Sequence, residues 1–179
     1  MTVLIDKPVS PLAIANTFLD MADMENRSLT PLEVQKLVYF AHGWHLAIKG
    51  NALFNERVEA WPYGPVIESV YHAFKHFKKK VITSRATISD FQEGTVIGEI
   101  ATLPKDMDKQ TQSIIHRVWD QYKNLSGAQF VEITHKPGTP WSIIASIHGG
   151  SPRSAWIPDE LIRQHFVDLA NKNKTKSSG

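Results

Sequence analysis

The sequence LTPLEVQKLVYFAHGW, residues 29–44, contains the most strongly marked helix start in the chain. Thr30 is a favourable N-cap, Pro31 suits the first helical position, and Glu33 completes a capping box. The helix is expected to end at Gly50, a residue that commonly terminates helices. Apolar residues occur on nearly every side of it, which predicts a central helix covered by neighbours all round.

A narrow polar stripe interrupts the apolar surface of this helix. Its members recur at steps of three, four and seven residues and are Gln35, Tyr39, His42, His45 and Lys49. Two interpretations stay open, namely a buried polar seam that is satisfied inside the protein and a groove that faces a partner. Gln35, His42 and His45 are therefore candidate partner-binding residues.

A second informative stretch is EAWPYGPVI, residues 59–67. Two prolines and a glycine restrict its backbone, and two aromatic side chains offer a large contact area at low entropic cost. The candidate contact residues are Trp61, Pro62, Tyr63, Gly64 and Pro65. The alternative interpretation is a structural corner in which Trp61 packs on the central helix.

The pattern of the remaining sequence predicts a mainly α fold, a compact helical domain of about six to seven helices with a small β-hairpin or short sheet. Residues 1–170 are expected to form one domain, and the polar residues 171–179 a disordered tail. Helices are expected at 10–24, 30–49, 65–79, 106–123, 126–135, 139–145 and 158–169. Residues 53–61 are expected to be extended, and 86–91 to pair with 95–100, in one sheet with 56–61.

Composition narrows the classes of function. The 179 residues include no cysteine, which excludes disulfides, thiolate metal sites and cysteine nucleophiles and fits a reducing cytoplasm. No apolar run is long enough to span a bilayer, and the apolar residues 3–5 are too few for a signal peptide. The net charge of +2 argues against a general nucleic-acid binder.

Although the positive and negative charges of the whole chain nearly cancel, one short segment is rich in cations. Its members are Lys75, His76, Lys78, Lys79 and Lys80. Three interpretations remain: a solvated helix end favoured by the helix dipole, a site for an acidic protein surface, and a phosphate-binding patch. Lys75 and Lys79 are thus candidate contact residues, and a nucleic-acid-binding regulator using residues 75–80 is the alternative function.

Patterns typical of enzymes are absent from the sequence. It contains no P-loop, no Gly-x-Gly-x-x-Gly and no Gly-x-Ser-x-Gly motif. His72 and His76 are four residues apart, as zinc ligands can be, but the sequence indicates no third ligand. We therefore expect no catalytic residues, no metal and no cofactor.

Several blocks of sequence, in order, resemble the Panacea domain of SocA-like antitoxins, a family that includes phage-associated GepA-like proteins. The similarity is strongest over residues 29–74 and includes the stretch EAWPYGPV and the sequence VYHAFK at 70–75. A second block consists of Thr134-His135 and Gly138-Thr139-Pro140-Trp141. A third begins at Ile157-Pro158.

The resemblance implies a helical antitoxin that binds a cognate toxin encoded by the adjacent gene. It leaves two routes of neutralisation open, which are masking of the toxin and delivery of it to the ClpXP protease. The family has no catalytic residues to transfer to this chain. Residues 78–105 match none of its blocks, so the choice of partner is a plausible role for that segment.

Overall fold

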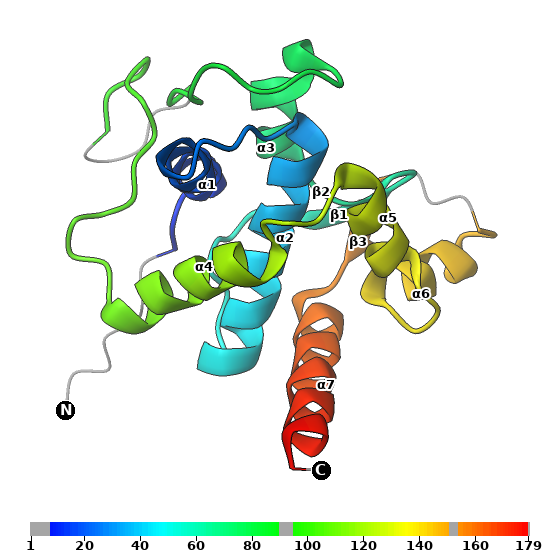
Figure 1. Ribbon diagram of the computed structural model, residues 1–179. Coiled ribbons are helices and arrows are strands. Elements are labelled where there is room, and N and C mark those ends of the chain that lie inside the picture. The colour runs from blue at the N-terminus through cyan, green and yellow to red at the C-terminus, as the bar shows by residue number, and fades with distance from the viewer. Residues whose placement is uncertain (1–7, 90–94, 151–153, 179) are drawn as a thin grey trace.

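Helix α2 (Pro31–Lys49) runs through the middle of the molecule, and the other elements are arranged around it (Figure 1). The computed structural model describes residues 8–89, 95–150 and 154–178. The described part contains seven α-helices and one three-stranded sheet. The expected mainly α fold is confirmed. Residues 3–5, the apolar stretch judged too short for a signal peptide, lie outside the described residues.

The remaining elements follow the chain in an order that mixes helices with short strands. The helices are α1 (Pro11–Met24), α3 (Glu68–Phe74), α4 (Lys109–Tyr122), α5 (Gly127–His135), α6 (Pro140–Ile147) and α7 (Asp159–Ser177). A 3-10 turn, Lys75–Phe77, follows α3. The strands are β1 (Val58–Trp61), β2 (Gly64–Ile67) and β3 (Ala155–Ile157), all antiparallel in the order β2-β1-β3.

The predicted ends of α2 are confirmed. The side chain of Thr30 accepts a hydrogen bond from the amide of Glu33, and the Glu33 carboxylate accepts one from the amide of Thr30 at 2.8 Å. Gly50 ends the helix with a left-handed φ of 76°. Twelve of the nineteen residues of α2 are buried, as its all-round apolar pattern predicted.

The stretch around Pro65 differs from the prediction. Pro65 does not open a helix but lies in β2, and α3 begins only at Glu68. A proline is tolerated in an edge strand because no neighbouring strand needs its missing N–H. The N-cap residue of α3, Ile67, makes no capping hydrogen bond with its side chain. Instead, the Glu56 carboxylate accepts hydrogen bonds from the amide and hydroxyl of Ser69 in the first turn of α3.

Two side chains of α2 donate hydrogen bonds to carbonyl groups on the outer edge of β2. The amide of Gln35 donates to the carbonyl of Ile67, and Nζ of Lys36 donates to the carbonyl of Pro65, both at 2.9 Å. An unpaired strand edge exposes such carbonyls, and here α2 covers them. Lys36 is completely buried, and this burial lowers the pKa of its amine to about 7.

Helices α2 and α7 approach each other closely at Gly43. A Cβ atom on Gly43 would lie 2.1 Å from the ring of Phe166, which is itself fully buried. The same ring makes edge-on contacts with Tyr39, Phe40 and Trp44. The glycine in the middle of α2 therefore makes room for an aromatic side chain from the last helix.

The segment between α3 and α4 is attached to α1 through a buried asparagine. The Asn16 side chain donates to the carbonyls of Ala86 and Ala101 and accepts from the amide of Ala86. Thr87 and Ile100 form the isolated bridge of this segment, so the predicted pairing of 86–91 with 95–100 is present there. It does not join the sheet of β1, and residues 90–94 lie outside the described residues.

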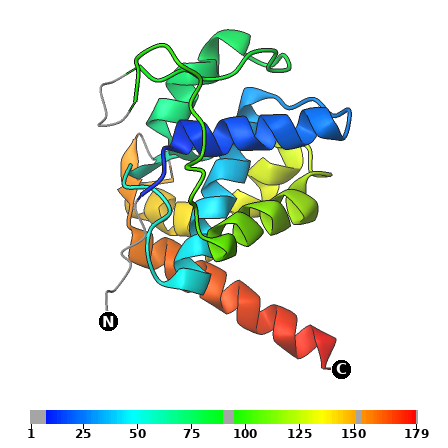
Figure 2. The same ribbon diagram turned by 90° about the vertical axis from the view of Figure 1, so that its left-hand side faces the viewer.

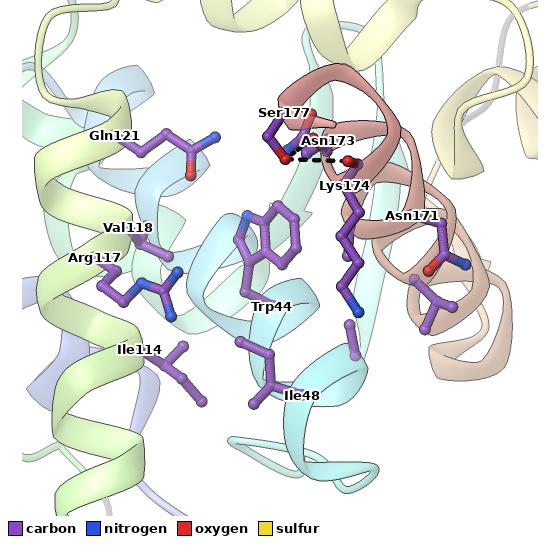
Figure 3. A pocket seen from close by; sticks show the side chains of 13 residues that line it. Trp44, Ile48, Ile114, Arg117, Val118, Gln121, Asn171, Asn173, Lys174 and Ser177 are labelled. Atoms are coloured by element: carbon purple, nitrogen blue, oxygen red, sulfur yellow. Dashed lines mark hydrogen bonds between the residues drawn. The ribbon is translucent and has the colours of Figure 1, made fainter. Parts of the chain in front are cut away.

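Helix α7 runs to Ser177, whereas a disordered tail was expected from residue 171. In its last turns the hydroxyl groups of Thr175 and Ser177 donate to carbonyls three and four residues earlier in the helix. The C-terminal half of α7 extends past the body of the protein (Figure 2). Together with α2 and α4 it borders a groove (Figure 3).

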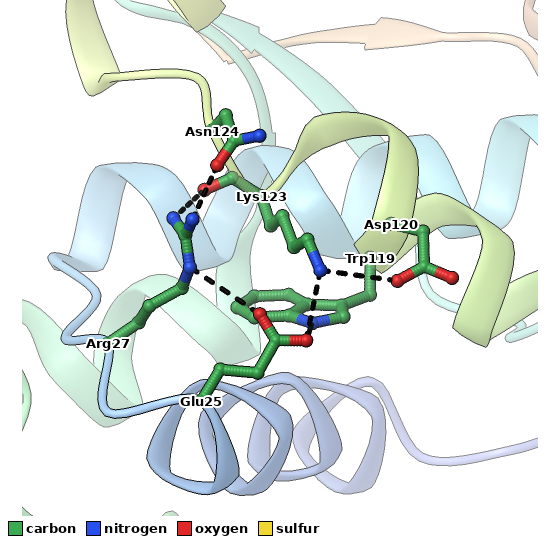
Figure 4. Close-up of polar contacts among 6 residues, drawn as sticks. All are labelled: Glu25, Arg27, Trp119, Asp120, Lys123 and Asn124. Atoms are coloured by element: carbon green, nitrogen blue, oxygen red, sulfur yellow. Dashed lines mark hydrogen bonds and ion pairs between the residues drawn. The ribbon is translucent and has the colours of Figure 1, made fainter.

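A group of polar contacts joins the end of α1 to the end of α4 (Figure 4). The Glu25 carboxylate accepts hydrogen bonds from Trp119 Nε1 at 3.1 Å and Lys123 Nζ at 3.0 Å. Arg27 donates to the carbonyl of Lys123 and to the side chain of Asn124. The hydrogen bond from Lys123 is the main cause that lowers the pKa of Glu25. These contacts fix the loop that leads into α2.

None of the helices in the described ranges combines the length and the apolar character that a membrane crossing requires.

We expect Gly43→Ala to destabilise the protein by about 1–3 kcal/mol, because the added methyl group overlaps the Phe166 ring in a packed core. This loss would outweigh the helix propensity of alanine, which favours the substitution by about 1 kcal/mol. Urea unfolding measures the difference. The control is Gly127→Ala, whose methyl group would meet only the flexible end of Leu32 at 3.0 Å. Equal effects of the two substitutions would contradict the close-packing explanation.

We expect Lys36→Met to remove part of the pH dependence of stability. The folded pKa of about 7 lies below the ordinary 10.5, so between these values the unfolded chain binds more protons. The free energy of unfolding of the unaltered protein therefore gains a contribution from Lys36 as the pH rises through this interval.

Urea unfolding between pH 6 and pH 9 measures this contribution. The slope should be shallower for Lys36→Met and unchanged for the control Lys172→Met, whose lysine is exposed. A Lys36→Met protein that keeps the full slope would show that Lys36 titrates normally.

Candidate partner-binding surface

The stretch EAWPYGPV forms a tight β-hairpin that projects its turn into solvent. Trp61 pairs with Gly64, so Pro62 and Tyr63 are the two residues of the turn. Val58 and Ala60 are buried, and the alternating residues Glu59 and Trp61 lie on the opposite face of β1. Tyr63 is 70% exposed. The turn is therefore accessible, and its side chains are not part of the core.

Two side chains from the C-terminal part of the chain hold the hairpin turn. Nε1 of Trp141 donates to the carbonyl of Trp61 at 2.7 Å, and Nε2 of His135 lies 3.1 Å from the carbonyl of Pro62. The rings of His135 and Trp141 contact each other, with centroids 3.7 Å apart. These residues come from the end of α5 and the start of α6, which orient them toward the turn.

Gly64 allows the hairpin to lie close to α2 and α5. Its φ is 109°, and a Cβ atom there would lie 2.9 Å from Oγ1 of Thr134 and 3.0 Å from Cε and Nζ of Lys36. A side chain at this position would be both strained and crowded. The hydrogen bond from Lys36 to Pro65 adjoins this contact. The hairpin is thus supported by α2, α5 and α6 together.

The outer face of the hairpin and its surroundings carry a set of aromatic side chains and one arginine. We call this set the aromatic surface, and its members are Arg57, Trp61, Tyr63, Tyr71 and Trp156. The rings of Trp61 and Tyr71 are 4.7 Å apart, and the guanidinium of Arg57 lies 4.7 Å from the centre of the Trp156 ring. Trp156 is 54% exposed and Tyr71 41% exposed.

Strand register brings Trp61 and Trp156 to one face of the sheet. Glu59 pairs with Trp156 of β3, and directly paired residues share a face of a sheet. Trp61 follows two residues after Glu59, and its Nε1 donates to the Glu59 carboxylate at 2.7 Å. Trp61 therefore packs on Tyr71 at the outer face, not on α2, which corrects the structural-corner interpretation in this detail. Exposed tryptophan, tyrosine and arginine on a fixed backbone are typical of protein-binding surfaces.

The histidines and glutamine of α2 are not part of any surface. His42 and His45 are at most 1% exposed and Gln35 is 5% exposed, so all three are buried and none lines a partner-facing groove. The seam is only partly satisfied, because Gln35 Oε1 and His42 Nδ1 have no hydrogen-bond partner among the described residues. Nε2 of His42 lies 2.8 Å from the Asp159 carboxylate at the start of α7, and its ring stacks on Phe54.

His45 connects the end of α2 to α4. Its ring nitrogens lie 2.8 Å from the carbonyl of Asn51 and 3.2 Å from Oγ1 of Thr111. Asp108 caps α4 beside them and forms an ion pair with Lys49 at 3.0 Å. Desolvation raises the pKa of Asp108, but the hydrogen bonds from Thr111 and the contact with Lys49 outweigh it and lower the pKa to about 2.

The predicted basic contact residues, Lys75 and Lys79, are both exposed, but they lie in different parts of the surface. Lys75 follows Tyr71 by one helical turn, which places it at the edge of the aromatic surface. Lys79 lies beyond the 3-10 turn that follows α3. Nε2 of His72 lies 3.2 Å from Glu68. Among the described residues, no group of His, Asp or Glu side chains is arranged to hold a metal ion.

Three members of the aromatic surface escaped the sequence analysis. The helix of Tyr71 starts three residues later than predicted, and Tyr71 faces outward although the adjacent Val70 is buried. Trp156 was not expected in a strand because β3 has only three residues. Arg57 could have been found, because it precedes Glu59 and Trp61 in the predicted strand at alternate positions.

Two comparisons with known proteins give matches to this chain. The family described as "Antitoxin SocA-like, Panacea domain" matches residues 34–142, a range that includes the hairpin and its supporting side chains from α2, α5 and α6. The chain is 38% identical to "Antitoxin SocA" of Caulobacter vibrioides over 159 residues, which are 88% of this chain and 82% of that protein. No solved structure matches significantly. The chain belongs to the family of SocA-like antitoxins that contain a Panacea domain.

Proposed function

We propose that this protein neutralises a cognate toxin by binding it directly through the aromatic surface, in the cytoplasm and without enzymatic activity. Membership of an antitoxin family supports the role, and a relative 38% identical over most of the chain is named an antitoxin. The observation that carries the choice of surface is the exposure of Tyr63, on a hairpin whose turn is held by His135 and Trp141, together with the exposure of Trp156 on the adjacent strand β3.

The support of the hairpin matters for binding energy. A partner that contacts a fixed hairpin does not have to order its backbone, so less of the interaction energy is lost on association. Aromatic side chains have few rotatable bonds and a large apolar area, which adds to the same advantage. Arg57 and Lys75 at the edges of the surface favour a toxin with acidic groups around an apolar centre.

We expect cells that express the toxin of the adjacent gene to grow when this protein is co-expressed. Substitutions in the aromatic surface should abolish this rescue. Tyr63→Ala and Trp156→Ala each remove an exposed aromatic side chain and should weaken toxin binding by about 10-fold or more. Growth assays and titration of purified toxin measure the two effects. The control is Met24→Ala, which removes an 84% exposed apolar side chain at the end of α1.

Two results would refute parts of this proposal. If the neighbouring gene product is harmless alone, or stays toxic when this protein is present, the antitoxin function is wrong. If rescue survives both aromatic substitutions but fails with Met24→Ala, the surface is wrong. Toxin abundance separates the two routes: masking leaves it unchanged, whereas delivery to ClpXP lowers it.

A nucleic-acid-binding regulator is the second candidate, because Lys75, Lys78, Lys79 and Lys80 are all exposed in one short segment. This function requires binding that weakens steeply with salt and disappears when Lys78, Lys79 and Lys80 are changed to Glu. A gel-shift assay at low salt with random duplex DNA and RNA tests it. Absence of a shift would leave the antitoxin function alone.

A further inference from the structure

The groove bordered by α2, α4 and α7 lies apart from the aromatic surface and has no role in the function proposed above. Its volume is about 580 Å³, enough for several apolar side chains. Trp44, Ala47 and Ile48 of α2 contribute to its lining, and Ile48 is 45% exposed. Nε1 of Trp44 donates to the hydroxyl of Tyr122 at 3.0 Å, which fixes the indole in the groove.

The walls have the pattern of a helix-packing surface that lacks one helix. Helix α4 lines the groove at Ile114 and at the positions three, four and seven residues later. Helix α7 does the same from Val167, again at steps of three, four and seven. Residues with this spacing form one face of a helix. Three helices thus turn one face each toward a common space, which is the shape that another helix fills.

The charged side chains in the lining of the groove are of one sign. Arg117 projects from α4 and Lys174 from α7, on either side of Trp44 (Figure 3). The other polar residues of the lining are uncharged, and no Asp or Glu is among the described residues that form it. A helix with carboxylates beside its apolar stripe complements this distribution.

We propose that this groove binds an amphipathic helix of a partner protein, with apolar residues against Trp44 and Ile48 and acidic residues beside Arg117 and Lys174. The bound helix would complete a packed group with α2, α4 and α7. This inference does not depend on the antitoxin function, because it concerns a different face of the protein.

The test uses two synthetic peptides of about 18 residues, long enough for five turns of helix. Both carry leucines at steps of three and four residues. One has glutamates beside this stripe, and the other has lysines at the same positions. Fluorescence anisotropy with the full-length protein at low salt should show tighter binding of the glutamate peptide by at least about 10-fold, with an affinity that falls as salt is added.

Two variants separate the apolar and the charged contributions. Ile48→Asp places a charge in the groove and should weaken the glutamate peptide about 10-fold or more. Arg117→Glu combined with Lys174→Glu, both at exposed positions, should reverse the preference so that the lysine peptide binds better. The control Ile147→Asp replaces a 70% exposed isoleucine of α6 and should change neither affinity. Circular dichroism confirms that each variant is folded.

Other occupants would give different results. If neither peptide binds, or if Ile48→Asp and Ile147→Asp act alike, the groove is not a helix-binding site. If the protein forms a dimer that Ile48→Asp dissociates, the occupant is a second copy of this chain and the proposal is wrong. If duplex DNA binds in place of the peptides and the double charge reversal abolishes that binding, the groove serves nucleic acid and the proposal is equally wrong.

Discussion

The hydrogen bond from Lys36 to the carbonyl of Pro65 is the contact on which the arrangement of the sheet depends. It places a fully buried amine from the central helix against the outer edge of β2, with Gln35 beside it on the carbonyl of Ile67. A buried amine is costly unless it finds a partner, and a strand edge has unpaired carbonyls. Each group satisfies the other. The hairpin is consequently held in one position on α2.

The sequence blocks that resemble this family have a physical role in that position. The block before Trp44 supplies Gln35 and Lys36, the block EAWPYGPV forms the hairpin, and the later block supplies His135 and Trp141. These blocks are distant in sequence and converge on one turn. Their polar atoms face backbone carbonyls of the hairpin, so they determine its position. The side chains of Tyr63 and Trp156 take no part in this support and remain exposed.

Much of the fold could be predicted because its signals are local. The capping box at Thr30 and the stop at Gly50 lie within the helix that they delimit. The errors concern contacts between distant segments. Pro65 was assigned to a helix because its role at a strand edge depends on Lys36, and β3 was missed because its pairing with β1 spans most of the chain. The candidate surface was found in part: Trp61 and Tyr63 have a local pattern, whereas Trp156 joins them only through the sheet.

The space at Gly43 that the Phe166 ring occupies affects how the core forms during synthesis of the chain. The ring that fills this space belongs to Phe166, in the last helix, so α2 can be made and surrounded by α1 and α4 while one side of it still lacks its aromatic partner. Domains emerge from the ribosome N-terminus first, and contacts across a long stretch of chain form late. A nascent chain that ends before α7 therefore exposes Tyr39, Phe40 and Trp44 where the complete protein buries a ring against them. Completion of the final helix closes the core, and an unfinished or truncated chain lacks these aromatic contacts.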